Sequence, residues 1–248
     1  MRQGFINWNG QRSDMIGVEI SEYPKYPIPQ RKMETYKVPG RNGDIIMMQD
    51  AWDNVSIAYS IFIGDGVQKH SVPVAVAKVS DWLCTPTGYC VLWDDFDPDH
   101  FRLAYFEGPH DIESLSIGRV GRTEIRFNCK PQRYLFSGTV PVEISSSPAT
   151  IYNPTMYPAK PMIFIDGTTD GTGTVTVNGP TYTITGIPAS GLYIDCEEMN
   201  CFDGNGLNMN SHVANASNQF PKLSPGTNEI SFSGDVSSVT ITPRWFEI

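Results

Sequence analysis

The chain has 248 residues, of which 40% are hydrophobic and 11% aromatic, and this length suffices for one large or two small domains. Its formal net charge is −9 and it has no run of eighteen apolar residues, so neither a basic nucleic-acid-binding surface nor a membrane-spanning helix is indicated. The charge is uneven, because residues 1–140 carry 15 Lys and Arg against 17 Asp and Glu, whereas residues 141–248 carry 3 against 10.

The first sixty-four residues predict short strands around one proline-rich segment. Strands are expected over residues 3–8 and 15–20, around the turn residues Asn9 and Gly10. Ser21–Gln30 (SEYPKYPIPQ) has three closely spaced prolines and cannot be a central strand, so we expect an extended arm. This arm either reaches a neighbouring subunit or lies on its own domain. Its candidate assembly contacts are Tyr23, Pro24, Tyr26, Pro27 and Pro29.

A hairpin follows the arm. Residues 33–38 and 44–49 are its expected strands, and Gly40–Gly43 closes it. Asn42-Gly43 is a strong turn dipeptide because both residue types tolerate positive φ. The tip residues that we expect to contact other subunits or a tube are Pro39, Gly40, Arg41, Asn42 and Gly43.

The next two segments differ in period. In Asn54–Gly64, apolar residues alternate with others and share one face, which predicts a strand; they are Val55, Ile57, Tyr59, Ile61 and Ile63. In Ser71–Cys84 the apolar spacing is helical, with Ser71 as N-cap and Pro73 in the first turn. We expect this to be the one substantial helix, covering an open side of a barrel or sheet.

Further strands are expected in the rest of the chain, and they fall into two groups with a change in composition between them. The segment after Pro131 is rich in Ser, Pro and Thr, which indicates domains at 1–138 and 150–248 with a linker at 139–149. The regular spacing of strands after the linker predicts a β-sandwich or jelly roll. The expected strands are Gly88–Trp93, Phe101–Glu107, Ile112–Ile117, Thr123–Cys129, Pro161–Asp166, Gly173–Val177, Pro180–Thr185, Gly191–Asp195, Thr227–Ser233 and Ser238–Pro243.

No segment predicts a catalytic, cofactor or metal site. Asp94–His100 (DDFDPDH) has carboxylates at alternate positions, but His100 and Phe106 stand where an EF-hand needs Gly and Glu, so a solvated turn is expected. Hydrolase, zinc-protease and phosphate-loop motifs are missing. Glu197 and Glu198 could serve glycoside hydrolysis only if two carboxyl groups faced each other across a cleft. The Asn-rich segment Asn200–Phe220 is either a solvated loop or a glycan-binding loop.

The five cysteines predict no disulfide framework or zinc knuckle, because their number is odd and no C-x-x-C pair occurs. We expect small, partly buried thiols, with a Cys196–Cys201 bridge as the alternative. The first ten residues also lack the apolar core of a secretory signal.

Several motifs in both halves together resemble the distal tail proteins of siphophages, the baseplate hubs. In the first half they are FINWNG at Phe5–Gly10, VPGRNGD at Val38–Asp44, DWL at Asp81–Leu83 and FNCKPQRY at Phe127–Tyr134. In the second half they are YNPTMYPAKPMIFIDG at Tyr152–Gly167, DCE at Asp195–Glu197 and FPKLSPGTNEISF at Phe220–Phe232. The order of these motifs is more specific than any one of them.

The resemblance implies an all-β fold with one substantial helix: an N-terminal β-barrel-like tail-hub domain and a C-terminal galectin-like β-sandwich. It implies a homohexameric ring at the distal end of the virion tail, assembled in the host cytoplasm. The ring would join the tail tube to the tail-tip protein and to receptor-binding proteins, and DNA would pass through its lumen without specific binding. No enzymatic residue, cofactor or membrane is implied. The rival hypotheses are a carbohydrate-binding module of a bacterial surface or secreted protein, and a glycan hydrolase.

Overall fold

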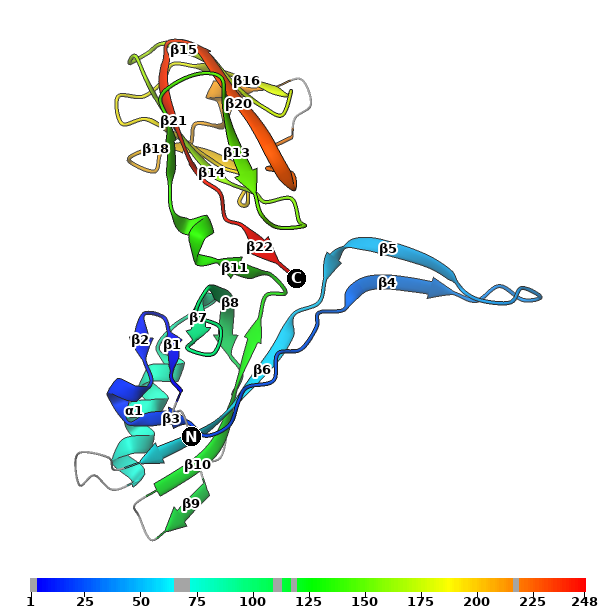
Figure 1. The fold of residues 1–248 in the computed structure, drawn as a ribbon, viewed down its shortest axis with the longest axis vertical. Helices are drawn as coiled ribbons and strands as arrows, with labels where there is room; N and C mark the ends of the chain where they lie inside the picture. The colour runs from blue at the N-terminus through cyan, green and yellow to red at the C-terminus, as the bar shows by residue number, and fades with distance from the viewer. Residues whose placement is uncertain (1–3, 65–71, 109–112, 117–119, 216–218) are drawn as a thin grey trace. The chain divides into compact units, whose positions relative to one another are not determined.

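The computed structural model describes residues 4–64, 72–108, 113–116, 120–215 and 219–248 (Figure 1). The chain divides into two compact units, residues 1–133 with Ile248 and residues 134–247. The expected linker at 139–149 instead contains strand β12 (Val142–Ile144), which pairs with a later strand of the second unit and buries Ile144. The Ser- and Pro-rich composition of this segment predicted a linker, although the segment contains one buried apolar side chain.

The first unit is built on one antiparallel sheet that nearly closes on itself. Its path is β2-β1-β7-β8-β10-β6-β3, and β9 pairs with β10. A single bridge between Gly4 and Ile20 then joins the beginning of the chain to β3, which gives the sheet its barrel-like form. The strands are β1 (Ile6–Trp8), β2 (Gln11–Arg12), β3 (Val18–Ile20), β6 (Val55–Gly64), β7 (Cys90–Asp94), β8 (His100–Phe106), β9 (Glu113–Ser116) and β10 (Val120–Cys129).

The interior of this barrel is apolar, as the alternating pattern of β6 predicts. All five of the expected residues of β6, from Val55 to Ile63, are buried, and Tyr59 and Trp8 both pack against Phe127. The predicted strand over 15–20 is shorter than expected, because Asp14–Ile16 forms a 3-10 turn (η1) that ends at Gly17 with φ of 79°. Burial of the apolar face of β6 therefore defines the core of the unit.

The expected helix is confirmed as α1 (Val72–Cys84). It packs against β6 and η1 and buries Val79, Trp82 and Leu83. Ser71, the expected N-cap, lies outside the described residues. Among the described residues, no helix has the length and hydropathy needed to span a bilayer.

The second unit is a sandwich of two five-stranded antiparallel sheets, as predicted. One sheet has the order β12-β21-β14-β17-β18 and the other the order β13-β20-β15-β16-β19. Alternate residues from both sheets meet in one core that includes Ile163, Ile184 and Ile241. Its strands, besides β12, are β13 (Ala149–Asn153), β14 (Met162–Gly167), β15 (Thr172–Val177), β16 (Thr181–Thr185), β17 (Leu192–Asp195), β18 (Asn200–Asp203), β19 (Val213–Ala214), β20 (Gly226–Gly234) and β21 (Val236–Thr242). A further short pair is β11 (Arg133–Leu135) with β22 (Phe246–Glu247).

Much of the Asn-rich segment 200–220 is structured, contrary to the expectation of a solvated loop. It contains β18, the 3-10 turn η3 (Asn210–His212) and β19, because Cys201 and Met209 are buried in the sandwich core. The amides bond to one another: the side chains of Asn208 and Asn210 both donate to the Asn200 side-chain oxygen. These asparagines therefore build the segment itself.

The five cysteines are free thiols, so the Cys196–Cys201 bridge is not formed. Cys129, Cys196 and Cys201 are buried, and burial raises the pKa of Cys129 to about 12 and that of Cys201 to about 11. A buried thiol with a raised pKa stays protonated and unreactive, which fits a packing role.

A substitution at Gly4 would test whether the bridge between Gly4 and Ile20 stabilises the barrel. A Cβ at this position would overlap the Phe96 ring and lie 2.8 Å from Asp95 Oδ1, next to the bridge to Ile20. We expect Gly4→Ala to lower the free energy of unfolding of the first unit by about 1–3 kcal/mol, measured by urea titration. Gln11→Ala, on an exposed neighbouring strand, is the control and should change stability by less than about 0.5 kcal/mol. Equal stability of the two variants would contradict this account of the closure.

Candidate assembly surface

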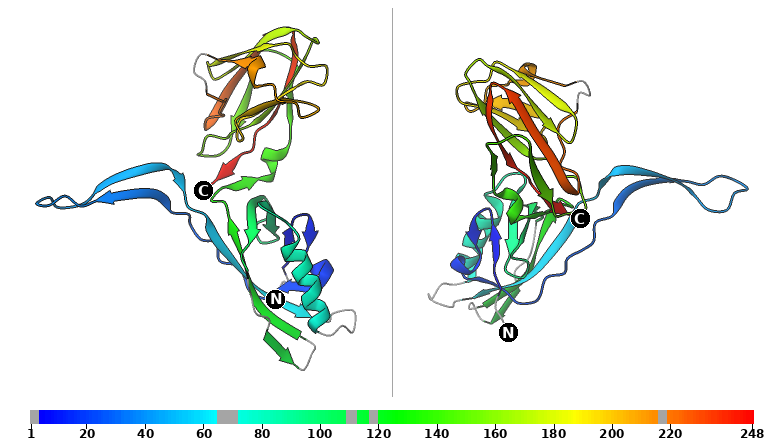
Figure 2. Two further views of the ribbon diagram at one scale, coloured as in Figure 1. Left: turned by 180° about the vertical axis from the view of Figure 1, so that it is seen from behind. Right: turned by 45° about the horizontal axis from the view of Figure 1, so that its top comes forward.

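The most unusual element of the first unit is a two-stranded hairpin that projects from the barrel (Figures 1 and 2). Its strands β4 (Arg31–Tyr36) and β5 (Ile45–Trp52) pair with each other and form a sheet of their own. Every residue from 32 to 50 is exposed. An isolated hairpin of two strands is marginally stable in water, so this element is built to be covered by something else.

The hairpin presents apolar side chains on both of its faces. The pairing register puts Tyr36, Ile45 and Met47 on one face and Met33, Ile46 and Met48 on the other. Met47 is 57% exposed and Met48 is 61% exposed. The consecutive apolar run Ile45–Met48 is typical of a strand that is covered on both sides, yet this chain covers neither side.

The tip of the hairpin holds the second group of expected contact residues. The last cross-strand pair is Tyr36–Ile45, so residues 37–44 form the loop, and all of them are exposed. Positive φ occurs at Gly40 and Gly43, at 79° and 82°, but not at Asn42. The expected hairpin, closed by Gly40–Gly43, is confirmed. Of the residues in its loop, only the two glycines need positive φ.

The proline arm is the root of the same projection. Pro24 and Pro29 are buried, Tyr26 and Pro27 are half-buried, and Ser21 binds the Ser60 carbonyl oxygen of β6. The arm thus lies on its own barrel, which was one of the two alternatives. The two groups of expected contact residues are opposite ends of one element: the arm fixes it and residues 39–43 form its tip.

Two residues of the arm remain open to a partner. Ile28 is 91% exposed and Tyr23 is 67% exposed, although the Tyr23 ring also lies edge-on to Phe96 at 4.9 Å between centroids. An exposed Ile beside the root of the hairpin extends the uncovered apolar surface toward the barrel.

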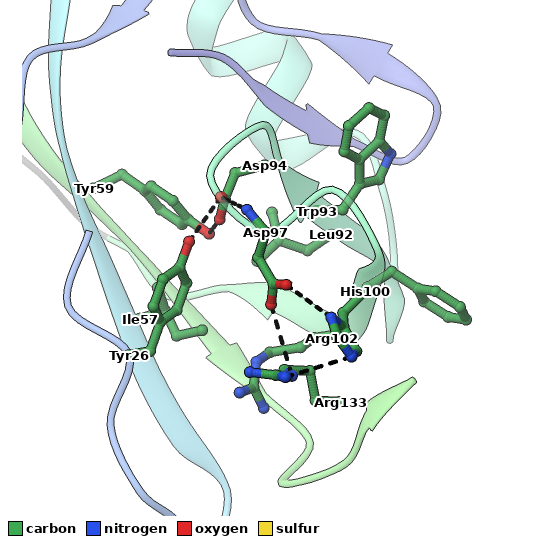
Figure 3. A pocket seen from close by; sticks show the side chains of 11 residues that line it. Tyr26, Ile57, Tyr59, Leu92, Trp93, Asp94, Asp97, His100, Arg102 and Arg133 are labelled. Atoms are coloured by element: carbon green, nitrogen blue, oxygen red, sulfur yellow. Dashed lines mark hydrogen bonds and ion pairs between the residues drawn. The ribbon is translucent and has the colours of Figure 1, made fainter. Parts of the chain in front are cut away.

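The arm is attached to the barrel through a buried carboxylate, Asp94 (Figure 3). This residue is 3% exposed and ends β7. The Tyr26 hydroxyl donates to Asp94 Oδ1 at 2.7 Å, and the Tyr59 hydroxyl of β6 donates to Oδ2 at 2.7 Å. The backbone N–H groups of Phe96 and Asp97 also donate to Oδ1. One carboxylate therefore ties the arm, β6 and the turn after β7 together.

The electrostatics of Asp94 reflect opposing effects. Burial raises its pKa above the ordinary value, while the two tyrosine hydroxyls and the two backbone N–H groups act to lower it. The same environment raises the pKa of Tyr59, through burial first and the Asp94 charge second. Both tyrosines accordingly stay protonated and serve as donors.

A second polar cluster, formed by Asp97, His100 and Arg133, lies beside Asp94. His100 Nδ1 lies 2.7 Å from Asp97 Oδ1, and an Arg133 nitrogen lies 3.4 Å from His100 Nε2. The cavity beside both groups measures about 20 Å³, room for a single water molecule and not for a ligand. In the described part of the chain, no three His, Cys, Asp or Glu side chains are grouped so that they could hold a metal ion. The expectation of a solvated turn is wrong for Asp94, because hydroxyl and backbone donors replace water around it.

The acidic DCE motif of the second unit also has a structural partner. Arg244 donates to both Asp195 oxygens, at 2.7 and 2.9 Å, and the N–H groups of Glu197 and Glu198 donate to Asp195 Oδ1. Burial acts to raise the pKa of Asp195, but the Arg244 guanidinium and the two backbone N–H groups together outweigh it, and the pKa lies below its ordinary value. Glu197 lies 3.4 Å from Lys160 Nζ, so one carboxylate of the pair considered for hydrolysis is engaged in an ion pair.

Comparison with known proteins gives a match in fold only. No protein-family model and no curated protein sequence matches this chain. The Dit (gp 19.1) protein of phage SPP1, described as a paradigm of the hub adsorption apparatus of phages that infect Gram-positive bacteria, superposes with a TM-score of 0.74 at 12% identity, over 96% of this chain and 97% of that one. The phage P2 baseplate in its activated conformation matches with TM-scores of 0.56 (with Ca, 8% identity) and 0.54 (with Sr, 10% identity), over 97% of both chains.

The expected resemblance to phage hub proteins is thus confirmed as a shared fold over nearly the whole chain. The expected fold class, all-β with one substantial helix, is confirmed as well. At such low identity, residue roles cannot be transferred from those proteins and must be inferred from this structure. Its exposed apolar hairpin is the feature that indicates a binding partner.

The Tyr26–Asp94 bond allows a test of how the hairpin is held. We expect Tyr26→Phe to lower the free energy of unfolding of the first unit by about 1.5–3 kcal/mol, because it removes a donor to a buried carboxylate. It should also speed proteolysis near residue 30. Tyr23→Phe is the matched control, since the Tyr23 side chain is mostly exposed.

The pH dependence gives a second readout of the same bond. Because the folded-state pKa of Asp94 is raised, its ionisation costs stability as the pH rises from the unfolded value through the folded one. Tyr26 offsets that cost, so Tyr26→Phe should be more damaging at about pH 7 than at about pH 4. A loss that is equal at both pH values would show that Tyr26 does not act through the carboxylate.

Proposed function

We propose that this chain is a structural hub protein of a phage tail tip, which forms a homohexameric ring between the tail tube and the tail-tip proteins. The observation that carries this proposal is the full-length match in fold, through both units, to the SPP1 Dit protein. That protein is described as a hub of the adsorption apparatus, and the same architecture suits the same place at the distal end of a virion tail.

The uncovered hairpin supports assembly from a second direction. An exposed strand pair with apolar residues on both faces favours association in water. A projecting element that binds a different surface of the next copy gives a heterologous contact. A heterologous contact builds either an open filament or a closed ring, and the rotation between copies decides which. We propose closure after six copies.

The charges agree with a ring through which DNA passes. Residues 1–140 carry 15 basic against 17 acidic side chains, so copies of this part repel one another little. The net charge of −9 does not favour retention of a polyanion in the lumen. The acidic second unit, galectin-like in the proposal, would face outward and hold tail-tip or receptor-binding proteins. Assembly would take place in the host cytoplasm.

The function proposed is one of position and not of reaction. Three of the carboxylates in the two segments that sequence analysis considered have structural partners: Asp94 binds two tyrosines, Asp97 binds His100, and Glu197 pairs with Lys160. A carbohydrate-binding module is the rival, and binding of the second unit with all of its strands, residues 134–248, on a glycan array would support it.

Native mass measurement of the purified protein, followed by negative-stain imaging, tests the ring directly. A particle of six chains with a central hole is expected. Labelling of virions with an antibody against the second unit tests the location, and label away from the tail apex would contradict the proposal. A mixture of purified hub and tail tube protein is the control for rings that need a partner to nucleate.

The hairpin allows assembly to be separated from folding. We expect Met48→Glu to lower the association constant of the copies by about tenfold or more, because it puts a charge on a surface that is buried in the ring. The melting temperature of the dilute monomer should not change, since Met48 is 61% exposed there. Met156→Glu is the matched control, a methionine that is 83% exposed in the second unit. Equal assembly of both variants would exclude the hairpin from the interface.

A further inference from the structure

A cleft on the helix side of the barrel is not used by any feature described so far. Its volume is about 370 Å³, larger than the cavity beside Asp94. It lies between α1 and the turn that joins β1 to β2. The residues that argue for its role are Trp8, Asn9, Ile16, Lys78, Asp81 and Trp82. The motifs FINWNG and DWL, far apart in the sequence, thus meet at one place on the surface.

Two residues that line this cleft carry buried donors without acceptors. Trp8 and Trp82 are 1% and 5% exposed, and within the described residues neither indole N–H has a hydrogen-bond partner. Buried donors are paired in nearly all proteins, so two unpaired indoles in one cleft are exceptional. Carbonyl oxygens brought in by another chain would satisfy them after a small rearrangement of the rings.

The rim of the cleft carries two charges without partners. Lys78 and Asp81 are exposed and lie three residues apart on α1, and neither has an ion-pair partner among the described residues. The hairpin tip carries charges in the same order and spacing, which match those of α1 in an antiparallel alignment: Arg41 and Asp44 are also three residues apart, exposed, and without such partners among the described residues. Arg41 against Asp81 and Asp44 against Lys78 would give two complementary pairs.

The positions of the two surfaces agree with this pairing. In both figures of the fold the hairpin leaves the barrel on one side and α1 lies on the other (Figures 1 and 2). A single copy therefore presents its projecting element and its cleft in opposite directions. That is the arrangement required for a head-to-tail contact, in which every copy uses both surfaces.

We propose that the cleft between α1 and the β1–β2 turn receives the hairpin tip, residues 37–44, of a second copy of this chain. This inference rests on the proposed ring and names its interface. Val38 and Pro39 pack against the two tryptophans, carbonyl groups of the loop accept from the indoles, and the charges of the tip meet Lys78 and Asp81. The loop suits this role because its carbonyl groups are not used in the hairpin ladder, although that of Val38 accepts from the Arg41 backbone N–H.

The chain supplies its own probe for this contact, because Cys84 is exposed and lies in α1 beside Thr85 of the cleft wall. Arg41→Cys, treated with a short bismaleimide at assembling concentrations, should give covalent dimers and longer ladders. The same change in a Cys84→Ser background should lose this product. Met156→Cys, on an exposed site of the second unit, is the matched control and should give no product that depends on Cys84.

Charge exchange distinguishes a specific contact from a chance collision. Asp81→Arg and Arg41→Asp should each lower the association constant by about two- to fivefold, and the double variant should recover most of that loss. Additive losses would overturn the pairing.

The outcomes separate this inference from the proposed function. A six-chain particle without a Cys84-dependent product overturns the docking site and leaves the ring intact. A Cys84-dependent dimer without closure after six copies supports the docking site and overturns the hexamer. The lack of both overturns both.

Discussion

The structure depends on one constraint: the hairpin β4–β5 cannot bury its own apolar side chains. Each face of the hairpin carries methionine and isoleucine side chains, and in the single chain both faces are exposed to solvent. The hydrophobic effect penalises that exposure in proportion to area, and an isolated hairpin has too few hydrogen bonds to offset it. The single chain therefore buries its two cores but leaves the apolar side chains of the hairpin exposed. We infer the assembly role from this exposed apolar surface.

The exposed hairpin can bind a partner specifically only if its orientation relative to the barrel is fixed. The Asp94 carboxylate fixes it, since it binds Tyr26 of the arm and Tyr59 of the barrel wall with bonds of equal length. Burial of a carboxylate is unfavourable, as its raised pKa records, and the site tolerates that cost because four donors surround the charge. An apolar contact would be more stable but would leave the arm free to slide, whereas charge-assisted bonds require one geometry.

The sequence was sufficient for elements whose pattern is local and insufficient for those that depend on distant partners. Strict alternation in Val55–Ile63 and helical spacing before Cys84 predicted β6 and α1, because burial on one face leaves a periodic trace. Strand β12 was missed because its strand partner, β21, lies far along the chain. Strand β18 was missed because its Asn-rich segment has few apolar residues and its amides bond to one another. Asp94 was assigned to a solvated turn because nothing in DDFDPDH reveals two tyrosines, 68 and 35 residues earlier in the chain.

In the first unit, several groups that the described residues leave unsatisfied gather at two places. The uncovered methionines and the lone tip charges lie on one projection, while the unpaired indoles and the charges Lys78 and Asp81 surround one cleft on the other side of the barrel. Elsewhere in the first unit, Asp94, Asp97 and His100 are bound, and the core is closed. An enzyme concentrates unusual groups at one cleft, where a substrate meets them together. Two separated and complementary surfaces on opposite sides of one barrel serve repetition, because each copy can then complete the next.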